Sequence, residues 1–112
     1  MIKKYRVKKN EEISKIISLK NSKGNAYFVI YKNEDYSNEH FRYAVSVSKK
    51  YGNAVERNKI KRRVRAIIDS QNIKPQFNLI IIIRPTVKKL NFEEIQKAVI
   101  EILKRTKVLE VK

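Results

Sequence analysis

Apolar residues recur three and four positions apart in three segments of the chain. This period predicts helices over residues 11–19 and 54–70, and a last helix that begins after Asn91. The apolar stripes consist of Ile13, Ile16 and Ile17; of Ile60, Val64, Ile67 and Ile68; and of Ile95, Ala98, Val99, Ile102 and Leu103. Each stripe occupies one side of its helix, so each helix is expected to pack against a common core.

Three other segments show the pattern of strands. Residues 27–32 are aromatic and β-branched, and residues 79–83 form an unbroken aliphatic run that is typical of a central strand covered on both faces. Residues 41–48 alternate, with Phe41, Tyr43, Val45 and Val47 on one face and Arg42, Ala44, Ser46 and Ser48 on the other. Residues 21–25 are expected to be a loop. The order helix, strand, strand, helix, strand, helix predicts an α+β sandwich with a mixed sheet.

Local signals support two helix starts. Asn10 is a suitable N-cap residue for the first helix, because acidic residues follow it in the first turn. Asn91 and Glu94 have the spacing of a capping box, and Leu90 is placed to pack on Ile95. These pairs predict where the first and last helices begin.

Length and composition limit the classes of protein that remain. The chain has 112 residues, 42% of them hydrophobic, which suits one domain over residues 1–112 with a basic arm at residues 1–9. Cysteine is absent, which excludes disulfides, zinc–thiolate sites and thiol nucleophiles and is compatible with the cytoplasm. The longest aliphatic run, residues 79–83, is too short to cross a bilayer.

The charge points to a polyanionic partner. Twenty-seven lysine and arginine residues face eleven acidic ones, a net charge of +16. Nucleic acid is the leading candidate, because neutralised phosphates release counterions when a basic protein binds. An acidic membrane surface and a merely solvated basic surface are the alternatives.

The basic residues concentrate in the predicted middle helix. Six of the nine residues from Arg57 to Arg65 are cationic. Arg57, Lys61 and Arg65 recur every four positions and climb one side of the helix, with Asn58 and Arg62 in the neighbouring row. A solvated helix face normally mixes the signs of its charges, whereas this helix has no acidic residue between Glu56 and Asp69. We therefore expect this face to contact phosphates.

The segment from Ser46 to Arg65 resembles the signature of the bacterial ribonuclease P protein family. It reads Ser-Val-Ser-Lys-Lys, a short gap, Gly-Asn-Ala-Val, and then Arg-Asn followed by Lys-Arg and a further Arg. The basic arm also resembles the opening of the family, residues 28–31 its first strand and residues 79–84 its third. The resemblance implies an α-β-β-α-β-α sandwich with a left-handed β-α-β crossover, although general rules favour the right hand.

The family's function follows as an expectation from the same resemblance. The protein would bind a separate catalytic RNA and the single-stranded 5′ leader of precursor tRNA, and it would need no protein partner. Mg²⁺ would be bound mainly by the RNA, and no metal site is expected on the protein. The implied RNA-binding residues are Lys49, Lys50, Asn53, Arg57, Asn58, Lys61, Arg62 and Arg65. The implied leader site consists of Ile13, Ile17, Tyr31, Arg42, Ser46 and Ser48.

Two positions of the implied leader site depart from the family. Phenylalanine is frequent in the family where this chain has Ile13 and Ile17, and isoleucine packs against a base without stacking on it. Burial in the core is the other interpretation of these two residues. Tyr31 retains an aromatic ring that can stack on a base, a contact worth about 1–3 kcal/mol.

The polypeptide itself is not expected to be catalytic. It shows no acidic cluster for two metal ions and no nucleophile motif, and the single histidine, His40, is expected to be a solvated loop residue. A self-sufficient nuclease is therefore disfavoured. A ribosomal-protein-like RNA binder without a processing role and a basic DNA-binding protein remain the other readings.

Overall fold

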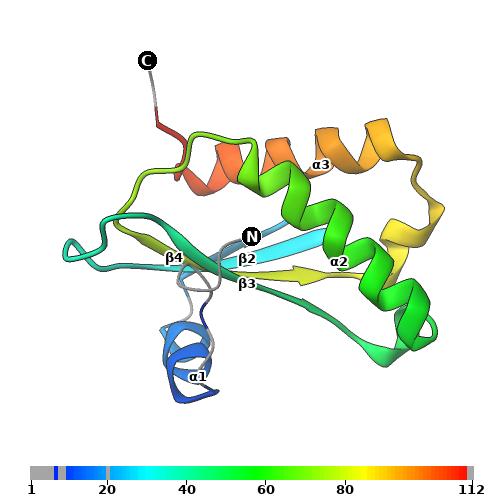
Figure 1. Ribbon diagram of the computed structural model, residues 1–112, viewed down its shortest axis with the longest axis horizontal. Coiled ribbons are helices and arrows are strands. Elements are labelled where there is room, and N and C mark those ends of the chain that lie inside the picture. Colours follow the sequence, from blue (N-terminus) through cyan, green and yellow to red (C-terminus); the bar gives the residue numbers. More distant parts are fainter. Residues whose placement is uncertain (1–6, 8–9, 20, 111–112) are drawn as a thin grey trace.

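A four-stranded mixed sheet forms the middle layer of the protein (Figure 1). The computed structural model describes residue 7, residues 10–19 and residues 21–110. The helices are α1 (Asn10–Ser18), α2 (Ala54–Asp69) and α3 (Phe92–Thr106), and the strands are β1 (Ser22–Gly24), β2 (Phe28–Glu34), β3 (Arg42–Val47) and β4 (Phe77–Ile83). Two short 3₁₀ helices, η2 (Lys49–Tyr51) and η3 (Pro85–Lys89), flank α2 and β4 in the chain.

The strand order is β1-β2-β4-β3. β2 is antiparallel to both β1 and β4, whereas β3 runs parallel to β4 and reaches it through α2. β4 therefore lies between two partners, and Leu79 and Ile81 in it are buried, as expected for a central strand. The left hand of the β3–α2–β4 crossover stays a prediction.

Helices cover the two faces of the sheet unequally. α2 and α3 lie on one face and α1 lies on the other (Figure 1). The larger core is formed between the sheet, α2 and α3 and contains the predicted stripes of both helices. A smaller cluster of Val7, Ile16 and Ile80 joins α1 to the sheet, with Ile13, Ile17, Tyr31, Ala44 and Ile82 packed around it. We call this second side the α1 face of the sheet.

Most of the predicted elements are confirmed, with small shifts at their ends. The alternation in β3 is confirmed, since Tyr43 and Val45 are buried in the larger core while Ser46 is exposed on the α1 face. α1 begins and ends one residue earlier than expected, and β4 begins two residues earlier, at Phe77. The basic arm predicted at residues 1–9 lies, apart from residue 7, outside the described residues.

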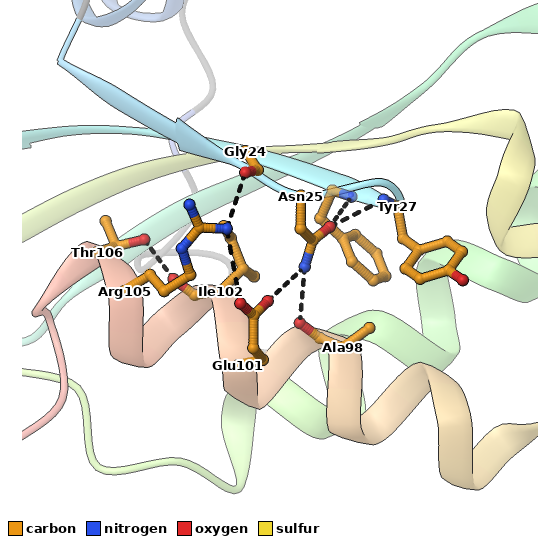
Figure 2. A network of polar contacts seen from close by, with 9 residues as sticks. Gly24, Asn25, Tyr27, Ala98, Glu101, Ile102, Arg105 and Thr106 are labelled. Atoms are coloured by element: carbon orange, nitrogen blue, oxygen red, sulfur yellow. Dashed lines mark hydrogen bonds and ion pairs between the residues drawn. The ribbon is translucent and has the colours of Figure 1, made fainter.

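The prediction of a loop over residues 21–25 is wrong for residues 22–24, which form the edge strand β1. The turn after β1 is tied to α3 by Asn25, whose Nδ2 donates to the Ala98 carbonyl at 3.3 Å and to Glu101 Oε2 at 2.7 Å (Figure 2). Its Oδ1 accepts two backbone N–H groups of the same turn. Arg105 adds a bond to the Gly24 carbonyl at 3.1 Å. β1 pairs with β2 close by in the chain, and contacts with α3 more than seventy residues away also hold the turn that follows it.

The start of α3 follows the predicted chemistry, whereas Asn10, predicted to cap α1 from outside, is the first residue of that helix. The Asn91 side chain accepts from the Glu94 backbone N–H at 2.9 Å, and the Glu94 side chain accepts from the Asn91 N–H, so the capping box is confirmed. Leu90 packs against the core to which Ile95 belongs. Among the helices of the described residues, none combines the length and the apolar character that a membrane span requires.

Candidate nucleic-acid interface

A second capping box fixes the start of α2 and therefore the direction of its side chains. Asn53 Oδ1 accepts from the Glu56 N–H at 2.9 Å, and Glu56 Oε1 accepts from the Asn53 N–H at 3.2 Å. A residue larger than Gly52 would disturb this box, because a Cβ at that position would lie 2.6 Å from Glu56 Oε1 and would displace the carboxylate. Sequence analysis missed this box, although Asn53 and Glu56 have the same spacing as Asn91 and Glu94.

The basic residues of α2 project from the helix as predicted. Asn58 and Arg62 are exposed, while Arg57, Lys61 and Arg65 are half-buried beside the apolar stripe. We call these five residues the basic ridge. Within the described part of the chain, no carboxylate pairs with any of its four cations. The acidic residue nearest in sequence, Glu56, is instead paired with Lys88 at 2.9 Å. The ridge therefore presents positive charge without an internal counterion.

Arg65 carries an unsatisfied donor at the end of this ridge. Its Nε is buried and has no hydrogen-bond partner in the described residues. Its carbonyl lies 3.5 Å from the Tyr43 hydroxyl, which donates to Asp69 at 2.6 Å. A buried donor without an acceptor is uncommon and costs free energy, so an incoming anion that rearranges this guanidinium would relieve that cost.

The apolar members of the implied leader site lie together on the α1 face. Ile13, Ile17 and Tyr31 are half-buried and pack around Ile16 and Ile80. Tyr31 is opposite Ile80 in the register of β2 and β4. Each of the three side chains thus packs against the smaller cluster and stays partly exposed. Their contact with a leader stays a prediction.

The polar members of the implied leader site lie along β3 and just beyond it. Arg42 pairs with Glu12 of α1 at 2.6 Å, an interaction that the sequence did not indicate because Glu12 was explained by the helix dipole alone. Ser46 is exposed on the α1 face, and Ser48 is exposed where β3 ends and η2 begins. Lys49 and Lys50 are exposed in η2 and lead to the start of α2. Ser46 and Ser48 therefore adjoin the implied RNA-binding residues in the chain, whereas the other members of the implied leader site lie on α1, β2 and the start of β3.

The sequence analysis expected His40 to be a solvated loop residue, but the structure shows that it is partly buried. Its ring is half-buried and stacks on Phe41 with 4.3 Å between the ring centroids, and Nδ1 lies 2.6 Å from the Phe41 carbonyl oxygen. Within the described residues, no three histidine, cysteine or acidic side chains gather as metal ligands do.

Fold and surface define a class: a small, strongly basic α+β protein whose helix α2 carries cations that pair with no carboxylate of the described residues. A family model described as Ribonuclease P matches residues 1–107. The chain is 40% identical to the ribonuclease P protein component of Enterococcus faecalis, over 100% of this chain and 97% of that protein. It is 43% identical to that of Listeria monocytogenes, over 100% of this chain and 96% of that protein.

Solved structures agree with the sequence matches. The Staphylococcus aureus RNase P protein is 38% identical and superimposes with a TM-score of 0.86, covering 95% of this chain and 98% of that one. The Thermotoga maritima RNase P protein is 26% identical with a TM-score of 0.80, covering 89% of this chain and 96% of that one. The chain belongs to the ribonuclease P protein family.

Proposed function

We propose that this chain is the protein subunit of a ribonuclease P ribonucleoprotein, the endoribonuclease that matures the 5′ end of tRNA. The observation that carries the proposal is the basic ridge, whose cations pair with no carboxylate in the described part of a chain that belongs to this family. Neutralisation of RNA phosphates by Arg57, Lys61, Arg62 and Arg65 would release counterions and drive binding. In this assignment the protein functions in the cytoplasm.

The RNA subunit would perform the hydrolysis with Mg²⁺ that it binds mainly itself. The described residues offer no acidic cluster for two metal ions, and the protein's excess of positive charge suits a different task. Its cations would reduce the repulsion between the catalytic RNA and the precursor tRNA, both of which are polyanions. Lys49, Lys50, Asn53 and Asn58 would add contacts around the ridge.

The 5′ leader of the precursor would lie on the α1 face. Tyr31 supplies a half-exposed ring for stacking on a base, and Ile13 and Ile17 supply apolar surface beside it. Arg42 would contact a phosphate in competition with Glu12, and Ser46 and Ser48 would form hydrogen bonds with the sugar or base. Unpaired bases suit such a surface, because their faces and edges are accessible.

Reconstitution tests the proposal. The pure protein is mixed with the cognate catalytic RNA at low Mg²⁺ and offered precursor tRNA, and 5′ cleavage is compared with that by the RNA alone. We expect the protein to increase the cleavage rate and the affinity for the precursor. A ribosomal-protein-like binder would bind RNA without this gain, and the absence of any gain would refute the processing role.

A further inference from the structure

A second group of cations lies on the other side of α2 from the row of Arg57, Lys61 and Arg65. At about 100° per residue, Lys59 points roughly 200° away from Arg57 around the helix axis. Arg63 follows Lys59 by one turn, and Lys88 approaches both from η3. These side chains line a cavity of about 200 Å³ together with Tyr51, Glu56 and Ile60. We call this cavity the α2–η3 pocket.

The α2–η3 pocket holds three cations and one carboxylate. Lys88 is fixed by the Glu56 carboxylate at 2.9 Å and by the Tyr51 carbonyl at 3.2 Å, and its Nζ lies 5.9 Å from the centre of the Tyr51 ring. Lys59 and Arg63 have no carboxylate partner within the described residues. The pocket thus keeps an excess of two positive charges, and one of its three cations is held in place.

Tyr51 adds a hydrogen-bond donor to this group. Burial raises the pKa of its phenol, Lys88 and Arg63 lower it, and Glu56 raises it, with burial the largest effect. Both cations are therefore near enough to the phenol to act on its charge. The phenol stays protonated at neutral pH, so its hydroxyl can donate to an oxygen beside the cations.

We propose that the α2–η3 pocket binds a backbone phosphate of the catalytic RNA through Lys59, Arg63 and Lys88. The inference rests on the proposed function and extends it to a contact outside the basic ridge. Arg63 can present two N–H groups to the phosphate, and Lys59 adds a flexible ammonium group. RNA that reaches the ridge and this pocket together would hold α2 from two sides and so fix the orientation of the protein.

The position in the fold separates the pocket from the face proposed for the leader and so favours the catalytic RNA as the source of the phosphate. α2 and η3 belong to the side of the sheet covered by α2 and α3, and the α1 face proposed for the leader is on the opposite side (Figure 1). A strand lying on the α1 face would have to leave it to reach Arg63. The larger cavity beside α3, of about 470 Å³, is a poor phosphate site because Glu94 and Glu101 line it.

The test uses full-length variants Lys59→Gln and Arg63→Gln, bound to the catalytic RNA alone over a range of salt concentrations. Each variant is expected to lower the slope of log affinity against log salt by about 0.9. Arg63→Lys keeps the charge and should restore the slope. Lys104→Gln removes one exposed charge from α3 and serves as the matched control, with no comparable change expected. Circular dichroism checks that each variant is folded.

The outcomes separate the inference from the proposed function. If both pocket variants behave as Lys104→Gln does while Arg57→Gln lowers the slope, the ridge binds RNA and the pocket does not. If the effect appears only when precursor tRNA is added to the assembled enzyme, the phosphate belongs to the substrate and the inference is wrong. If the unmodified protein does not bind the catalytic RNA, the proposed function fails first.

Discussion

The Arg42 guanidinium lies against the Glu12 carboxylate, with Nη1 2.6 Å from Oε1 and Nη2 3.2 Å from Oε2. This two-point contact joins β3 to α1 across the α1 face, and both side chains are about a quarter exposed. A phosphate that binds Arg42 must therefore compete with a carboxylate of the same chain. The same ion pair holds α1 against β3 and neutralises the Arg42 charge that a leader phosphate would need.

Glu12→Gln should affect stability and leader binding in opposite directions. Loss of the charge-assisted contact is expected to cost about 1 kcal/mol in urea unfolding, because the pair is only partly buried. Binding of leader-bearing precursor tRNA should acquire a steeper salt dependence, since the competing carboxylate is gone. Glu11→Gln is the matched control in the same helix turn. If Glu12→Gln and Glu11→Gln change the salt dependence of precursor binding equally, Arg42 does not contact the leader.

Arg57→Ala and Arg65→Ala should each weaken binding of the catalytic RNA. The slope of log affinity against log salt is expected to fall by about one unit per lost phosphate contact. Lys97→Ala removes an exposed cation of α3 and should leave the slope nearly unchanged. A ridge variant that keeps the full slope would show that its side chain does not touch phosphate.

The two capping boxes provide a matched pair of variants at Asn53 and Asn91. Each change to alanine removes an N-cap that accepts from a backbone N–H, at an expected cost of about 1 kcal/mol in thermal or urea unfolding. Only Asn53→Ala should also weaken binding of the catalytic RNA, when affinities are measured on fully folded protein. Equal affinities for the two variants would limit Asn53 to its structural role.

Tyr31→Ala should weaken the binding of leader-bearing precursor tRNA by about 1–3 kcal/mol, which is the typical contribution of a base stacked on an aromatic ring. Affinity for mature tRNA should be unchanged, since it has no leader. Tyr31→Phe retains the ring and is expected to bind the precursor nearly as well as the unmodified protein. Equal losses for precursor and mature tRNA would refute a leader contact and indicate that the ring mainly packs on Ile80.

Acid should remove the stabilisation contributed by Glu56. The hydrogen bond from Lys88, followed by that from the Asn53 N–H, holds the pKa of this carboxyl below its ordinary value of 4.5. Because the folded pKa is lowered, the contribution is present above 4.5 and is lost as the pH falls through the lowered value. The stability difference between the unmodified protein and Glu56→Gln should therefore shrink in urea titrations as the pH falls below 4.5. A difference that does not vary with pH would contradict this role.

Local chemistry explains which parts of the interface were predictable. The ridge on α2 was predictable because residues three and four apart share a helix face, so Arg57, Lys61 and Arg65 had to align. The ion pair between Arg42 and Glu12 was not predictable from local patterns, because thirty residues separate the two side chains in the sequence. The α2–η3 pocket was missed for the same reason, because Lys88 reaches α2 only after the chain has passed through β4.

The sequence alone determined the order of the elements, the apolar face of each helix and the helix that carries the cations. These features depend on periods of two and 3.6 residues and on caps that act over three positions. Tertiary structure decided how α3 holds the turn after β1, which side of the sheet α1 covers, and that Glu12 neutralises Arg42 while Glu56 neutralises Lys88. Those outcomes depend on contacts between distant segments, whose free energies become available only when the core has brought the segments together.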